Sequence, residues 1–198
     1  MAPRSDVTII NVGYRSTNYW VVSAGTSRVL VDLGYPGTMG TMRANLERMG
    51  VPLAEIRYAL ATHYHLDHAG LGQDLKQAGV PLLVVDLQAG MIPRMKQHVK
   101  PADHYLEIAL DDNVTITCGE SRALLQRIGI GGEIVHTPGH SDDSVSLLLD
   151  SGAVFTGDLT HPSLAGAEDG GLARASWERL KARGATRVYP GHGPVRPM

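Results

Sequence analysis

The sequence contains only one cysteine, Cys118, among its 198 residues. An internal disulfide is therefore impossible, and the lone thiol is expected to be a small buried side chain rather than a nucleophile. Aromatic residues make up only 5% of the chain, and the formal net charge is −2, with no cluster of Lys or Arg. Because nucleic-acid binding requires a clustered cationic face, we expect no nucleic-acid partner.

Long apolar runs are lacking as well. The N-terminal segment MAPRSDVTIINVGYRS contains no apolar stretch of the length that is typical of a secretory signal. No segment approaches the roughly 18 uninterrupted apolar residues of a membrane span. We therefore predict a cytoplasmic protein with no membrane partner. The length is typical of one folded unit, and we assign residues 1–198 to a single domain.

Short apolar segments separated by turns predict a chain in which strands and helices are mixed. The expected strands are Val7–Gly13, Asn18–Ala24, Ser27–Leu33, Arg57–Ala61, Pro81–Val85, Val114–Thr117, Glu133–His136, Ser144–Leu149, Ala153–Thr156 and Thr186–Tyr189. The expected helices are Gly37–Met49, Ala69–Ala78, Leu87–Val99 and Arg174–Arg183. Mixed sheets with helices outside them are the natural layering for this order.

Four potential metal ligands lie within six residues, in the segment that runs from His63 to His68. His63 and His65 are two residues apart, so their side chains can converge on one ion. Asp67 and His68 follow and point elsewhere, which suits a second ion beside the first. Packing imidazoles and a carboxylate this densely without a cation would desolvate their lone pairs. The segment therefore predicts a metal site, with two metals.

Three further potential ligands, His140, Asp158 and His192, each follow an apolar segment and stand directly after a glycine. Glycine allows the backbone to bend sharply and to approach the site closely. Taken alone, each of these short motifs is typical of an ordinary turn. Because all three recur at the end of an expected strand, we expect them to converge with the histidine-rich segment at one edge of a sheet.

On these motifs the chain resembles the metallo-β-lactamase-fold hydrolase superfamily, from the first expected strand to His192. The resemblance implies an α/β (α+β) fold, a four-layer αββα sandwich in which two mixed β-sheets are flanked by helices. It implies that the first metal is held by His63, His65 and His140. It implies that the second is held by Asp67, His68 and His192, and that Asp158 bridges both. Asp32 matches an acid that the family uses to orient its ligand loops, although a plain turn role is equally open.

The same resemblance implies a dinuclear metal-dependent hydrolase. A metal-bridging hydroxide would attack a small ester, thioester, lactone or amide, with Asp67 and Asp158 as the catalytic carboxylates. All the ligands are nitrogen or oxygen atoms, which suits zinc but also iron or manganese. We expect two divalent ions, with zinc indicated by family likeness, and a small molecule as the partner.

Other functions are known for this superfamily, and the sequence bears on several of them. Glutathione-thioester hydrolases of the superfamily carry a Cys-Gly-Arg signature after the bridging aspartate, where this chain has Leu159-Thr160-His161-Pro162-Ser163. The absence of this signature disfavours glutathione-thioester hydrolysis. It also disfavours a mononuclear iron persulfide-dioxygenase-like redox enzyme, but we keep that enzyme as the alternative function. Zinc β-lactamases replace the bridging aspartate with Cys or Ser, so β-lactam cleavage is expected at most as a side activity. A non-catalytic binding protein is disfavoured by the complete ligand set.

The remaining histidines carry weaker signals. His161 follows Asp158 by three residues, and it is a candidate for contact with substrate, as is Tyr35 on the loop after Asp32. The other three are expected to be structural or at the surface: His136 in the core with a satisfied hydrogen bond, and His98 and His104 facing solvent or a pocket rim. The substrate and the oligomeric state are left open.

Overall fold

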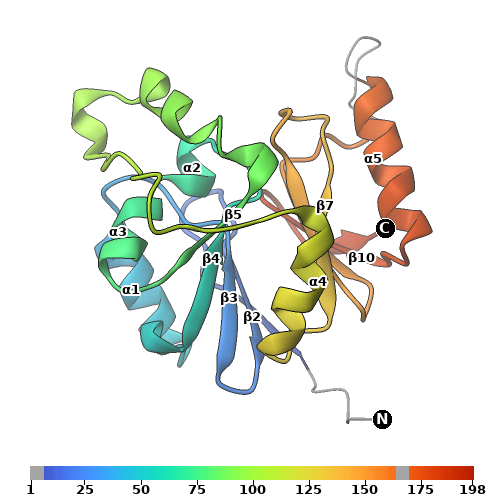
Figure 1. Ribbon diagram of the computed structural model, residues 1–198, viewed down its shortest axis with the longest axis horizontal. Helices are drawn as coiled ribbons and strands as arrows, with labels where there is room; N and C mark the ends of the chain where they lie inside the picture. The colour runs from blue at the N-terminus through green and yellow to red at the C-terminus, as the bar shows by residue number, and fades with distance from the viewer. Residues whose placement is uncertain (1–6, 164–169) are drawn as a thin grey trace.

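The computed structural model describes residues 7–163 and 170–198. One sheet has six strands in the order β1-β2-β3-β4-β5-β6 (Figure 1). Its strands are β1 (Thr8–Asn11), β2 (Trp20–Ala24), β3 (Ser27–Val31), β4 (Ile56–Leu60), β5 (Leu82–Val85) and β6 (Val114–Ile116). The first three strands pair antiparallel and the last four pair parallel, so the sheet is mixed.

The other sheet has five strands in the order β11-β10-β9-β8-β7. Its strands are β7 (Gly132–His136), β8 (Val145–Leu149), β9 (Ala153–Gly157), β10 (Arg187–Pro190) and β11 (Arg196–Pro197). Strands β9 and β10 are parallel, whereas β8 is antiparallel to both of its neighbours. Strands β7, β9 and β10 therefore run in the same direction and end at the same edge of their sheet.

Alternating side chains along the strands build three apolar layers. In β3, Val29 and Val31 pack into the layer between the two sheets, while Leu30 packs on the opposite face, beneath the helices α1 (Met39–Arg48) and α3 (Gly72–Gln77). In β8, Leu148 points outward onto the helix α5 (Gly170–Ala182). Helices cover both outer faces of the paired sheets (Figure 1), which confirms the predicted αββα sandwich.

Several helices differ from the expected ones. The predicted helix Ala69–Ala78 begins earlier and is divided into α2 (Leu66–Ala69) and α3. The prediction of one helical stretch over Leu87–Val99 is wrong in type, because the structure has two 3₁₀ helices, η2 (Asp86–Gln88) and η3 (Ile92–His98). Pro93 lacks a backbone donor, which favours a short 3₁₀ turn over a continuous α-helix.

Other short elements complete the chain. The sequence did not predict α4 (Cys118–Arg127), which contributes Leu124 and Leu125 to the layer between the sheets. Two further 3₁₀ helices are η1 (Leu53–Glu55) and η4 (Pro101–Asp103). The predicted inward face of the last helix is confirmed, since Trp177 and Leu180 are 4% and 0% exposed. No helix in the described part of the chain is long and apolar enough to cross a bilayer.

Candidate metal centre

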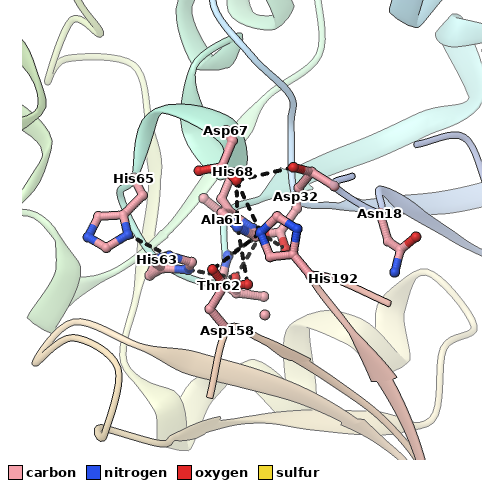
Figure 2. A network of polar contacts seen from close by, with 12 residues as sticks. Asn18, Asp32, Ala61, Thr62, His63, His65, Asp67, His68, Asp158 and His192 are labelled. Carbon is pink, nitrogen blue, oxygen red and sulfur yellow. Dashed lines mark hydrogen bonds and ion pairs between the residues drawn. The ribbon is translucent and has the colours of Figure 1, made fainter. Parts of the chain in front are cut away.

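Five loops that follow strands bring the predicted ligands together between the two sheets. The first sheet contributes Asp32 after β3 and the segment His63–His68 after β4. The second sheet contributes His140 after β7, Asp158 directly after β9 and His192 after β10. Figure 2 shows side chains from both sheets directed at one another, although His63 and His192 are 129 residues apart along the chain.

The first candidate ligand group consists of His63, His65 and His140. The Nδ1 atom of His65 lies 3.1 Å from the Nε2 atoms of both His63 and His140. His63 is buried, whereas His65 and His140 are exposed, so the group has a buried floor and an open rim. Nitrogen ligands at about 2.0–2.1 Å from a tetrahedral zinc ion lie about 3.3 Å from one another, close to these separations.

The second group consists of Asp67, His68 and His192. The Oδ2 atom of Asp67 lies 3.2 Å from His192 Nε2 and 3.3 Å from His68 Nε2. His68 is fully buried, and His192 is partly exposed at the rim. The hydroxyl of Thr17 donates a hydrogen bond to the same Asp67 oxygen at 3.1 Å, which fixes the orientation of the carboxylate.

Asp158 lies between the two groups. Its Oδ1 atom is 3.3 Å from His68 Nε2, and its Oδ2 atom is 3.4 Å from His192 Nε2 and 3.8 Å from His140 Nε2. One carboxylate thus approaches ligands of both groups. This position is compatible with the bridging role that the family resemblance implies for Asp158.

The donor set fits divalent cations. His68 Nε2 and Asp158 Oδ1 are buried and have no hydrogen-bond partner among the described residues. Leaving such atoms unsatisfied is costly, and a cation between them would satisfy both. The facing nitrogens of the three histidines in the first group also offer lone pairs that a shared cation would satisfy at once.

At His63, Asp67 and Asp158, burial and neighbouring charges favour the protonation states that metals require, whereas His68 has to lose a proton before it can bind one. Burial, reinforced by the neighbouring histidines, holds the pKa of His63 well below its usual range and keeps the ring neutral. Burial alone would raise the pKa values of Asp67 and Asp158, but the His68 ring, 3.3 Å from each carboxylate, holds both below their usual range. Burial would likewise lower the pKa of His68, but Asp32, Asp158 and Asp67 raise it well above its ordinary value.

Asp32 contacts the ligand segment directly. It is 1% exposed and adopts a positive φ of 63°. Its Oδ2 atom accepts a hydrogen bond from His68 Nδ1 at 2.9 Å, and its Oδ1 atom accepts from the backbone N–H and hydroxyl of Thr62, both at 2.8 Å. Of the two roles that the sequence left open, the structure therefore supports the orienting one. This hydrogen bond directs Nε2 of His68 into the centre.

Two buried residues that the sequence did not single out support the same segment. The side-chain amide of Gln88 donates to the carbonyl oxygens of Ala61 and Asp143, at 3.2 Å in both cases. Asp143 in turn accepts a hydrogen bond from the backbone N–H of Tyr64 at 2.9 Å. No local motif marks Gln88, because its partners lie far away along the chain.

The two substrate candidates differ in position. The Tyr35 hydroxyl lies 3.4 Å from the hydroxyl of Thr17, which itself contacts Asp67, so Tyr35 stands beside the centre. His161 is exposed, and among the described residues its ring contacts Ser163 and Trp177 rather than a candidate ligand. The structure thus places Tyr35 at the rim, and within residues 7–163 and 170–198 it gives no contact that links His161 to the centre.

The other histidines are peripheral. His98 and His104 are exposed, in agreement with the sequence. His136 has the expected hydrogen bond, from Nε2 to the carbonyl oxygen of Asp142 at 2.8 Å, but the prediction of a core position is wrong because the residue is only half-buried at the end of β7. Cys118 is likewise half-buried rather than fully buried.

Comparison with known proteins agrees with this geometry. Residues 12–192 match the family profile described as the Metallo-beta-lactamase superfamily. The chain belongs to this superfamily. The superfamily fold implies binding of divalent metal, and the two ligand groups above are the candidate sites for it.

Several relatives carry names that indicate a hydrolase. A "Lactamase-like protein" of Pestalotiopsis microspora is 32% identical over 91% of this chain and 50% of its own length. An "Atrochrysone carboxyl ACP thioesterase" of Aspergillus fumigatus is 32% identical over 91% of this chain and 52% of its own length. This chain thus spans about half the length of these relatives. A "Probable metallo-hydrolase" of Methanocaldococcus jannaschii is 26% identical over 92% of this chain and 90% of its own length.

A solved structure is also similar. The protein TTHA1623, solved in a di-iron-bound form, superposes with a TM-score of 0.71 and is 25% identical. The similarity covers 96% of this chain and 94% of that chain. Together, the family and the names of these relatives support an enzyme of the hydrolase type.

Proposed function

We propose that the protein is a dinuclear metal-dependent hydrolase that cleaves a small ester, thioester, lactone or amide. The observation that carries the proposal is the position of Asp158, whose two carboxylate oxygens approach His68 on one side and His140 on the other. The thioesterase relative makes acyl thioesters the first substrates to test.

Each residue of the centre has a task in such a reaction. The first group, His63, His65 and His140, and the second, Asp67, His68 and His192, would each hold one ion, with Asp158 shared between them. When bound, divalent ions supply a water of lowered pKa and polarise a carbonyl oxygen. Asp67, whose carboxylate accepts a hydrogen bond from the Thr17 hydroxyl, would orient that water. The open rim formed by His65 and His140 leaves room for a small molecule to reach the centre.

Elemental analysis of protein purified without added metal tests the dinuclear assignment. We expect about two divalent ions per chain, with zinc favoured and iron also compatible with the ligand set. One iron per chain together with oxygen consumption during turnover would instead support the mononuclear redox alternative. The number of ions per chain tests the dinuclear assignment before any substrate is known.

The substrate class requires a panel of chromogenic thioesters, esters, lactones and cephalosporins, assayed with and without chelator. Asp158→Ala should lower both metal content and turnover, the latter by at least about 100-fold, because a shared ligand is lost. Asp150→Ala is the matched control, since Asp150 is an exposed carboxylate that pairs with Arg122. Full activity in Asp158→Ala, or equal losses in both variants, would refute the proposal.

A further inference from the structure

A tight turn beside the metal centre holds an arginine in an unusual backbone conformation. The residues Tyr14–Thr17 form a two-residue hairpin turn, in which the backbone N–H of each end donates to the carbonyl oxygen of the other at 3.1 and 3.2 Å. Arg15, the first central residue, has a φ of +56°. Hairpin turns with a positive φ at this position favour glycine. Non-glycine residues at such angles point to a functional reason for the strain.

The turn is fixed to the loop that carries His192. The carbonyl oxygen of Ser16 accepts a hydrogen bond from His192 Nδ1 at 2.8 Å. The backbone N–H of Asn18 donates to the carbonyl oxygen of Gly191 at 2.7 Å, and its side-chain amide donates to that of Gly193 at 2.8 Å. The turn is therefore a rigid part of the rim, next to the second ligand group.

The guanidinium of Arg15 lies over two aromatic rings. It lies 5.3 Å from the ring centre of Tyr14 and 5.4 Å from that of Tyr35. A cation–π contact of this kind leaves the N–H donors of the guanidinium available for an anion. Arg15 is exposed, and within the described residues it forms no ion pair. A positive charge with free donors is thus presented at the rim.

We propose that Arg15 binds an anionic group of the substrate, a carboxylate or a phosphate, that lies several atoms from the bond to be cleaved. Planar, bidentate recognition of oxyanions is the chemistry for which arginine is suited. Because the side chain is already held by two rings, little rotamer freedom is lost on binding. This inference rests on the proposed hydrolase function, and it narrows the substrate class to anionic acyl compounds.

The test measures binding of three non-hydrolysable thioethers by calorimetry, with the protein as purified. S-butyl-pantetheine is neutral, S-butyl-4′-phosphopantetheine adds a phosphate at the far end, and S-(3-carboxypropyl)-pantetheine adds a carboxylate at the near end. Wild-type protein should bind one of the two anionic thioethers more tightly than the neutral one. Arg15→Gln should reduce that preference about tenfold, the size expected for a charge-assisted hydrogen bond at an exposed site.

The variant Arg15→Gly distinguishes a loss of anion binding from a loss of stability. Glycine relieves the positive φ, so the melting temperature should stay equal or rise while the anion preference falls as in Arg15→Gln. Two controls match the charge and the backbone: Arg43→Gln removes an exposed arginine of α1, and Asp112→Gly relieves a φ of +57° elsewhere. Both should keep the wild-type preference for the anionic thioether.

The inference is overturned if wild-type protein shows no preference for either anionic thioether, if it binds none of the three, or if Arg15→Gln keeps the wild-type preference. Whether Arg15 binds a phosphate or a carboxylate is shown by which of the two anionic thioethers loses affinity in Arg15→Gln. Thioether binding needs no turnover, so a failure of the proposed hydrolysis would show separately, as an absence of activity toward the matching thioesters.

Discussion

Replacing Asp32 by Asn tests whether this buried carboxylate prepares His68 for a metal. Asn has nearly the same size and tolerates the positive φ of 63°, so the backbone is preserved. One of the two oxygens, however, becomes an NH₂ group, which cannot accept the hydrogen bond that now comes from His68 Nδ1 or those that come from Thr62. Loss of such a partner of a ligating histidine typically lowers metal affinity 10–100-fold, or about 1.4–2.8 kcal/mol.

The same substitution should destabilise the metal-free protein. A buried donor without an acceptor costs about 1–3 kcal/mol, and Asp32 is only 1% exposed. Metal affinity is measured by competition with a chromophoric chelator, and stability by thermal unfolding of chelated protein. Asp143→Asn is the matched control, because this carboxylate is 2% exposed and accepts the backbone N–H of Tyr64 rather than an imidazole. It should lower stability with at most a few-fold change in metal affinity. Wild-type metal affinity in Asp32→Asn would refute the reasoning and leave Asp32 a purely structural role.

One further substitution and one labelling reaction also have definite expected outcomes. In Gly191→Ala the new Cβ would lie 2.5 Å from Asp158 Oδ1 and 2.6 Å from His68 Cε1. The metal content of this variant, measured by elemental analysis, should therefore fall. In the control variant Gly40→Ala the new Cβ meets open space, so its metal content should stay unchanged. Burial raises the pKa of the Cys118 thiol, so at pH 7.5 it should react with iodoacetamide more slowly than glutathione does. The midpoint of its rate against pH should lie above the ordinary value for cysteine of about 8.5, and a midpoint at or below that value would contradict the assignment.

The candidate ligands could be predicted because each carries a local signal. Every one of them follows an apolar strand, and His140, Asp158 and His192 are each preceded by a glycine. The structure explains the pattern, since a side chain at Gly157 would collide with the hydroxyl of Thr62, and one at Gly191 would collide with Asp158. Glycine is thus required by the close approach of loops at this edge of the sheets, and that requirement is visible in the sequence.

The supporting residues could not be predicted, because their partners are distant along the chain. Gln88 is fully buried and holds carbonyl oxygens 27 and 55 residues away, at Ala61 and Asp143. No periodicity or spacing encodes such contacts. The helix α4 is a different case, since Thr117 and Glu120 form a capping box at its start, a local signal that was present and overlooked.

Metal removal should loosen the two sheets at one edge without separating them. His63 follows β4 of the first sheet and His140 follows β7 of the second, and Asp67 and His192 are divided between the sheets in the same way. An ion held by either group therefore cross-links the sheets, and a ligand that binds only the folded state contributes about 2.7 kcal/mol at a concentration 100-fold above Kd.

For a chain of this size that energy corresponds to about 5–10 °C in melting temperature. The apolar layer between the sheets does not depend on metal, since Val31, Leu60 and Phe155 in that layer are all 0% exposed. Chelated protein should therefore keep its far-ultraviolet circular dichroism and melt at a lower temperature, which added divalent ions restore. A melting temperature that is the same with and without metal would show that these histidines and carboxylates do not join the sheets through an ion. Loss of the dichroism on chelation would show that the inter-sheet layer is too weak to hold the fold alone.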